Sequence, residues 1–182
     1  DVLPFFRKSE DFYRGADAMH GTGGEWRIEK ARVRWAVLDA FQQAAREAGI
    51  PVTEDFNRGD NEGSSYFDVN QRSGIRWNTS KAFLKPARNR PNLTILTKAQ
   101  VRRLIIEGGE VKGVEFQFQG EARKAYASRE TVLSAGAIGS PQILQLSGIG
   151  RGEVLKQAGI DVVQDVRSVG ENLQDHLQLR MV

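Results

Sequence analysis

The chain has 182 residues, of which 40% are hydrophobic and 27% charged, a balance typical of soluble, folded proteins and not of disordered ones. It contains no cysteine, which excludes disulfides, thiolate nucleophiles and cysteine-based zinc sites, and only two histidines, which argues against a multi-histidine metal site. The net charge is +3 and both signs are interleaved, so no nucleic-acid-binding surface is predicted.

Two further expectations concern the membrane and the cell compartment. No apolar run approaches the roughly 20 residues that cross a bilayer, so we expect no transmembrane segment, while peripheral membrane association stays open. The absence of cysteine fits the reducing cytoplasm. The first residues, Asp1 to Arg7, have neither an initiator Met nor a signal-peptide layout, and we expect an internal piece of a longer polypeptide.

The first part of the chain is expected to combine irregular stretches with one helix. Residues 1–30 are mixed in character, and the glycines between Gly21 and Gly24 are interpreted as a flexible connection. Residues 32–48 carry apolar side chains at steps of three and four, which predicts an amphipathic helix with its stripe packed in a core and a left-handed end at Gly49. The stripe comprises Val33, Val37, Ala40, Phe41, Ala44, Ala45 and Ala48.

Residues 53–76 resemble a calcium-binding loop at first sight, because they are rich in Asp, Asn and Gly. The twelfth position counted from Asp55 is Tyr66 instead of a bidentate Glu, so we interpret the run as a polar loop. Asn78 and the two residues after it are expected to cap a short helix over residues 81–84 that Pro86 ends.

From Asn92 the pattern changes to strands, beginning with a β-prone run at residues 93–96. Phe116 and Phe118 alternate with Gln117 and Gln119, which predicts a strand with one solvated face. Turn signals surround this strand, and we expect a three-stranded meander formed by residues 101–106, 111–119 and 122–128.

The last third is expected to contain a strand at residues 131–134, a turn of small residues at Ala135 to Ala137, and a helix with Ser140 as N-cap and Pro141 as first residue, closed by Gly148. A second helix over residues 153–158 and a strand over 160–163 follow. Small residues at a turn let the backbone approach a planar or anionic ligand, and the helix N-terminus offers free N–H groups. Many α/β proteins have such a corner without a ligand.

The residue string at this corner is more specific than its shape. Residues 136–150, GAIGSPQILQLSGIG, resemble the second signature of the glucose-methanol-choline (GMC) oxidoreductases at every defined position. The block VGENLQDH at residues 169–176 resembles the family's next motif, and residues 81–87 and 90–93 resemble upstream blocks in the right order. Arg167 and Ser168 depart from the Pro-Gly that relatives usually carry there. The resemblance is closest to the choline and alcohol dehydrogenase branch.

This resemblance implies a fold of the α/β (α+β) class: part of an FAD-binding α/β domain with a β-meander, plus part of an antiparallel-sheet substrate domain. Residues 1–92 are expected to belong mostly to the substrate domain and residues 93–182 mostly to the FAD domain. It implies FAD as cofactor, a small-molecule alcohol as substrate, and the remainder of the same polypeptide as partner. FAD accepts a hydride from the alcohol carbon while a histidine removes the hydroxyl proton.

The resemblance also assigns residues. The backbone of Val101 is expected at the adenine end of FAD, and Ala135, Gly136 and Ala137 are expected along the cofactor. No catalytic residue and no metal ligand is predicted, because the family's catalytic histidine and its Gly-x-Gly-x-x-Gly pyrophosphate loop have no counterpart in this sequence. The alternatives are a nucleotide-binding module without redox activity and a non-catalytic interaction domain.

The two histidines have no predicted chemistry. His176 belongs to the VGENLQDH block and is expected to play a structural role, and Asp175 to cap a loop. His20 is expected either to face solvent or to line the substrate domain, and the sequence does not separate these two readings.

Overall fold

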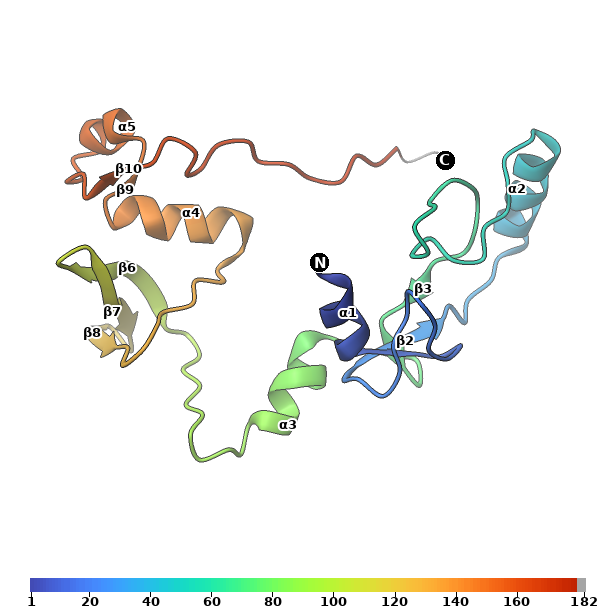
Figure 1. Ribbon diagram of the computed structural model, residues 1–182, viewed down its shortest axis with the longest axis horizontal. Helices are drawn as coiled ribbons and strands as arrows, with labels where there is room; N and C mark the ends of the chain where they lie inside the picture. Colours follow the sequence, from blue (N-terminus) through green and yellow to red (C-terminus); the bar gives the residue numbers. More distant parts are fainter. Residues whose placement is uncertain (180–182) are drawn as a thin grey trace. The chain divides into compact units, whose positions relative to one another are not determined.

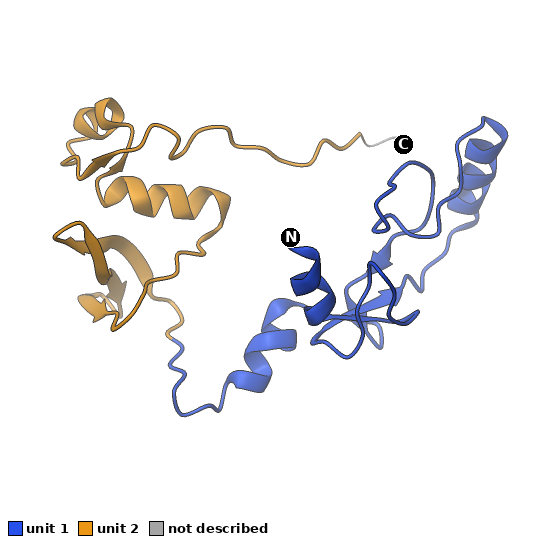
Figure 2. Ribbon diagram, viewed as in Figure 1, with its two compact units in different colours: residues 1–95 blue, residues 96–182 orange. Residues whose placement is uncertain are grey.

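The computed structural model describes residues 1–179 and divides the chain into two compact units: unit 1, Asp1–Ile95, and unit 2, which begins at Leu96 (Figure 2). Both units mix short helices with small sheets, as expected for the α/β (α+β) class (Figure 1). The boundary between the units lies close to the predicted domain boundary after residue 92. The assignment of these parts to a substrate domain and an FAD domain stays a prediction.

Unit 1 begins with more regular structure than the sequence predicted. Helix α1, Leu3–Ser9, has Pro4 in its first turn, where the missing N–H costs nothing. Strand β1, Glu10–Phe12, runs parallel to β2, Trp26–Lys30, and β2 pairs antiparallel with β3, Asp68–Val69. The expectation of an irregular segment over residues 1–30 is therefore wrong, because pairing with distant residues orders it.

The glycines before β2 are sites of close packing. A Cβ atom added to Gly21 would lie 1.7 Å from the carbonyl oxygen of Arg7, and one added to Gly24 would lie 2.3 Å from the carbonyl carbon of Ser9. Both contacts are made by the end of α1, so only residues without a side chain fit there. The interpretation of this stretch as a flexible connection is wrong.

Helix α2, Ala36–Glu47, confirms the predicted amphipathic helix, although it begins four residues later than expected. Gly49 has a φ of +87° and ends it in the left-handed region, as predicted. Its apolar stripe is not in a core: Val37 is 67% exposed and Phe41 54%, and Ala45 alone is buried in this helix. Helical spacing shows that one face of α2 is apolar, but it does not show whether this part of the chain covers that face.

The polar loop predicted over residues 53–76 is present over residues 53–67. The rest of the prediction is wrong, because β3 and a hairpin of β4, Gln71–Arg72, and β5, Ile75–Arg76, occupy residues 68–76. A π-helical turn, η1, Ser80–Leu84, then continues into α3, Lys85–Ala87.

The start of this helical segment is as predicted, and its end is not. The side-chain oxygen of Asn78 accepts a hydrogen bond from the backbone N–H of Lys81 at 3.0 Å, which confirms the cap. The expectation that Pro86 ends the helix is wrong, because Pro86 lies in the first turn of α3.

Unit 2 contains the predicted meander. Strands β6, Gln100–Glu107, β7, Glu110–Phe118, and β8, Glu121–Tyr126, pair antiparallel in chain order. Two-residue turns join them, at Gly108–Gly109 and Gln119–Gly120, and all four turn residues have positive φ. Such turns match the twist of the strands, and this explains why the sequence predicted the meander well.

The two faces of the meander differ as the alternation predicted. Leu104 and Phe116 are buried on one face. Arg103 and Glu115 form an ion pair at 3.0 Å on the other.

Helix α4, Gly136–Leu146, packs beside β6, and the backbone N–H of Leu104 donates to the hydroxyl of Ser147 at 2.8 Å. Ser147 itself donates to the carbonyl of Ile143, so it joins the end of α4 to the edge strand.

The start of α4 differs from the prediction. The helix begins at Gly136, and Ser140 and Pro141 lie one turn inside it. The hydroxyl of Ser140 reaches back to accept the N–H of Ala135 at 3.0 Å. A Ser-Pro pair is typical of a helix start, but here it lies inside the helix. A proline in the second turn is tolerated, because it leaves only one carbonyl, that of Ala137, without its helical hydrogen-bond partner.

Two predicted strands, residues 93–96 and 131–134, are irregular in the structure. The described residues offer neither of them a neighbouring strand, and an extended segment without a neighbour makes no ladder. The predicted strand at 160–163 is also wrong: pairing occurs at β10, Gln164–Asp165, which runs parallel to β9, Ile149–Gly150.

The predicted second helix is confirmed as α5, Gly152–Gln157, and Gly148 closes α4 with a φ of +84°. Within residues 1–179, no helix combines the length and apolar character that a bilayer span requires.

Candidate functional site

The predicted cofactor corner, Ala135 to Ala137, is open on its outer side. Gly136 has a φ of +86°, and a Cβ atom added to it would meet no other atom of the described chain within 4 Å. All three residues are exposed, and so are the large side chains nearby, Val132 at 77% and Ile138 at 73%. The corner therefore leaves room for a ligand to approach the backbone closely.

The electrostatics of the corner favour a negatively charged or electron-rich group. The first N–H groups of a helix have no partner inside it and give the helix start a partial positive charge. The first turn of α4 contains no acidic residue to neutralise this charge. The N–H of Ala135 donates to the hydroxyl of Ser140, and this bond uses none of the N–H groups of the following turn. The corner can thus donate hydrogen bonds to an anionic or carbonyl oxygen.

A hollow of about 410 Å³ lies next to this corner. One wall is α4 and the other is the segment from Gly170 to Leu173, which α4 holds through a hydrogen bond from the side-chain amide of Gln145 to the carbonyl of Val169 at 3.3 Å. The hollow is lined by Ala137, Ile138, Pro141, Gln142, Gln145, Gly170, Glu171 and Leu173. Only Ala137 was predicted. The signal for the second wall was the VGENLQDH block, which carries Gly170 and Leu173.

Val101 lies apart from the corner, on β6. It is half-buried and pairs with Phe116, and its carbonyl accepts a 3.4 Å hydrogen bond from the side chain of Gln100. β6 is the edge strand of the meander, so one side of its backbone has no strand partner. The contact between β6 and Ser147 lies at the far end of α4, about 16 Å along the helix from Gly136. Of the four predicted residues, Ala135, Gly136 and Ala137 are neighbours in the chain, and Val101 lies on another element.

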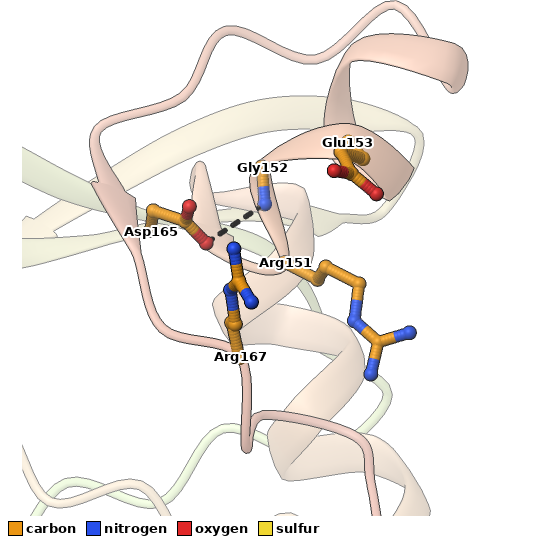
Figure 3. A pocket seen from close by; sticks show the side chains of 5 residues that line it. All are labelled: Arg151, Gly152, Glu153, Asp165 and Arg167. Carbon is orange, nitrogen blue, oxygen red and sulfur yellow. Dashed lines mark hydrogen bonds between the residues drawn. The ribbon is translucent and has the colours of Figure 1, made fainter.

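A second hollow, of about 200 Å³, lies at the start of α5 (Figure 3). In Figure 3, Asp165 points at Gly152 and accepts its backbone N–H at 3.0 Å. Arg151 forms an ion pair with Glu171 at 2.9 Å, and Arg167 lines the wall. The polar groups here cap a helix and pair with each other, and this arrangement suggests no reaction chemistry.

The two histidines lie in different environments. His20 is 3% exposed, so the solvent-facing reading is wrong. Its Nδ1 lies 3.1 Å from the carboxylate of Glu10 and its Nε2 lies 3.0 Å from that of Asp55. His176 is exposed, and its backbone N–H donates to Asp175 at 2.8 Å. A structural role for His176 stays a prediction.

Comparison with known proteins agrees with this picture. Residues 1–178 match the protein family described as "GMC oxidoreductase". Mitochondrial choline dehydrogenase of Mus musculus is 42% identical over 177 residues, which is 97% of this chain and 30% of that protein. Oxygen-dependent choline dehydrogenase of Photobacterium profundum is 43% identical over 185 residues, 98% of this chain and 32% of that protein. The chain thus spans about a third of the length of these relatives.

Solved structures give the same result. The crystal structure of pyridoxine 4-oxidase from Mesorbium loti superposes with a TM-score of 0.85 at 38% identity, covering 90% of this chain and 32% of that one. An FAD-dependent oxidoreductase from Chaetomium thermophilum superposes with a TM-score of 0.88 at 29% identity, covering 96% and 33%. With the family match over nearly all of its length, the chain belongs to the GMC oxidoreductases.

Proposed function

We propose that this chain is part of an FAD-dependent oxidoreductase that oxidises the CH–OH group of a choline-like or other primary alcohol to an aldehyde. The observation that carries the proposal is the open corner at Gly136, which has a left-handed backbone, free space on its outer side and an uncompensated helix start beside it. Relatives named choline dehydrogenase, about 40% identical, support the substrate class.

The residues of the corner fit FAD. The backbone of Ala135, Gly136 and Ala137 would lie along the cofactor, and the N–H groups at the start of α4 would donate to its oxygens. The backbone of Val101, on β6, would meet the adenine end. When bound, FAD supplies the oxidant that accepts a hydride from the alcohol carbon.

Neither histidine of this chain is proposed as the base that removes the hydroxyl proton. Both ring nitrogens of His20 face carboxylates and the side chain is buried, so it offers no nitrogen to a substrate. His176 lies in the VGENLQDH block, to which the family resemblance gives no base. We therefore assign the proton-accepting histidine to a part of the polypeptide outside these residues.

The remainder of the polypeptide is also the partner that we propose for the exposed apolar surface. The chain exposes 14498 Å², whereas two separate compact units sharing its 20.3 kDa would expose about 10,600 Å² together. The exposed large apolar side chains include Val37 and Phe41 on α2. In relatives three times as long, other segments are available to cover such faces.

We place the protein in a reducing compartment such as the cytoplasm, since this chain contains no cysteine.

The test uses the complete open reading frame that contains this chain. We expect the purified protein to carry the visible absorbance of flavin and to oxidise choline or a simple primary alcohol with an artificial electron acceptor. A protein that binds flavin and oxidises no alcohol points to a nucleotide-binding module without this activity. A colourless, folded protein that takes up no added FAD contradicts the proposal and leaves the interaction-domain alternative.

A further inference from the structure

One stretch of the chain is strongly basic. The interleaving of charges expected for the whole sequence does not extend to residues 69–106, which hold nine of the 26 Lys and Arg residues and none of the 23 Asp and Glu residues. Six of the nine belong to unit 1, on the β4–β5 hairpin, on the helical segment η1–α3 and just after it: Arg72, Arg76, Lys81, Lys85, Arg88 and Arg90. This basic segment, residues 72–90, is separate from the cofactor corner, which belongs to unit 2.

The helical part of the basic segment, labelled α3 in Figure 1, carries its cations on one face. Lys81, Lys85 and Arg88 follow one another at steps of four and three residues, a spacing that puts side chains on the same side of a helix. Between them, the ring of Phe83 stacks on Trp26 of β2 at 5.9 Å between centroids. Phe83 therefore attaches this segment to the sheet, and the cations lie on another face.

The cations of the basic segment are poorly neutralised by the rest of the described chain. Lys81 donates to the carbonyl of Arg76 at 2.9 Å, which joins the hairpin to the helical segment. Arg72 lies 3.7 Å from Asp11, whereas the other five cations form no ion pair within residues 1–179. Burying Lys or Arg without a partner is costly, so we expect this face to meet water or anionic groups in the complete enzyme.

Apolar side chains accompany these charges. Leu84 precedes Lys85 on the helical segment, Ile75 precedes Arg76 on β5, and both apolar side chains are exposed. An anionic membrane surface offers a partner to each kind of side chain, because its headgroups attract cations and the boundary of its acyl chains accepts apolar groups.

The aromatic side chains of the basic segment favour a membrane over a single-stranded nucleic acid. Nucleic-acid bases stack on free aromatic faces. Here the guanidinium of Arg72 lies over the ring of Trp77, 4.7 Å from its centroid, and Phe83 is stacked on Trp26. Each of these rings already has a partner on one face, and the exposed apolar groups beside the cations are aliphatic.

We propose that residues 72–90 form a peripheral docking surface for an anionic lipid bilayer. Lys85, Arg88 and Arg90 approach the phosphate headgroups, and Leu84 enters the boundary of the acyl chains. Each basic residue close to an anionic leaflet strengthens binding about fivefold, and this attraction falls off within a Debye length, about 8 Å at physiological ionic strength. Binding through this surface is thus reversible and sensitive to salt.

The test is co-sedimentation of the complete enzyme with vesicles of phosphatidylglycerol and phosphatidylcholine, and with vesicles of phosphatidylcholine alone. We expect binding to the first kind only, and its loss in about 1 M salt, where the Debye length is about 3 Å. No binding to the anionic vesicles would overturn the proposal. So would equally tight binding of RNA or polyglutamate, because the surface would then recognise any polyanion.

Variants of exposed side chains separate this surface from net charge. The triple variant Lys85→Gln, Arg88→Gln and Arg90→Gln should bind at least about thirtyfold less tightly, with unchanged thermal stability and flavin content. Lys85→Gln alone should lose about fivefold and serves if the triple variant fails to fold. The matched control removes three other exposed cations and should bind like the wild type: Arg46→Gln, Lys124→Gln and Lys156→Gln.

A further variant tests the apolar contact. Leu84→Gln leaves every charge in place and should weaken binding about threefold or more, since one apolar side chain no longer enters the boundary. Wild-type binding by Leu84→Gln would contradict this insertion. Wild-type binding by the triple variant, or an equal loss in the matched control, would overturn the docking surface itself.

Discussion

Two glycines of this chain provide a matched pair that tests the cofactor corner. Gly136 has a φ of +86° and Gly120, in the β7–β8 turn, has a φ of +85°, and an added Cβ atom at either position meets no atom within 4 Å. Gly136→Ala and Gly120→Ala therefore carry the same backbone strain, about 1–2 kcal/mol each, and no steric clash within the described chain. We expect the two variants of the complete enzyme to lose similar thermal stability.

The variants should differ in their affinity for FAD. If the cofactor lies against the corner, the methyl group of Gly136→Ala occupies its space, and we expect at least about tenfold weaker retention of FAD, or about 1.4 kcal/mol. Gly120→Ala should retain FAD normally. The assay is the flavin-to-protein ratio after dialysis, measured with thermal unfolding of the apoprotein on the same samples. Equal retention by the two variants would show that FAD does not lie against Gly136.

Three further changes test the packing described above. Ser147→Ala leaves the buried N–H of Leu104 without an acceptor and should lower the free energy of unfolding by about 1–3 kcal/mol in denaturant titration. Gly24→Ala places a methyl group against the end of α1 and should cost about 3 kcal/mol or more, measured in the same way. Burial raises the pKa of the Asp11 carboxyl, but the Gly23 N–H and the Arg27 guanidinium outweigh it and hold the pKa below 3.8. Asp11 therefore stabilises the fold above about pH 4 and loses this effect as the pH falls, so Asp11→Asn should flatten the acid side of the stability profile.

Each of these three has its own control and refuting result. Ser128→Ala removes an exposed hydroxyl and should change the free energy of unfolding by less than about 0.5 kcal/mol. If Ser147→Ala lost as little stability as Ser128→Ala, the hydrogen bond between Ser147 and β6 would be refuted. Gly23→Ala meets no neighbouring atom and should cost only its backbone strain, so similar losses at Gly23 and Gly24 would contradict the packing argument. An unchanged acid profile in Asp11→Asn would show that this carboxylate is not stabilised by its neighbours.

The sequence predicted best the elements whose structure is local. The meander was confirmed because the turns at Gly108–Gly109 and Gln119–Gly120 pin each pairing within a few residues. The end of α2 at Gly49 was confirmed for a similar reason, since the left-handed residue follows the helix directly.

Elements that depend on distant partners were predicted poorly. Residues 131–134 have strand character, but a strand exists only beside another strand. Gly21 and Gly24 were read as flexible because a glycine that packs closely against a helix looks the same in sequence as one in a loose loop. His20 was ambiguous because its environment is built by Glu10 and Asp55, which no spacing rule connects.

The candidate site was predicted in part. The small residues from Ala135 to Ala137 are open to a ligand, as their type suggested, but whether they and Val101 contact FAD stays a prediction. The opposite wall of the hollow, Gly170 to Leu173, was missed because it approaches α4 only through the fold.

The contrast between short and long connections also bears on how the chain acquires its shape during synthesis. Each pairing of the meander closes a two-residue turn, whereas unit 1 joins Arg14 to Asp68 and Glu25 to Trp77, which are 54 and 52 residues apart. Closing a long loop costs more entropy and takes longer than forming a hairpin, which needs about 1–10 μs. On the ribosome, each hairpin of the meander can therefore form as soon as its second strand emerges, whereas the contacts of unit 1 cannot close until Trp77, 52 residues after Glu25, has been synthesised. The apolar face of α2 stays exposed even when these contacts have formed, so unit 1 is where we expect the nascent chain to be most dependent on chaperones.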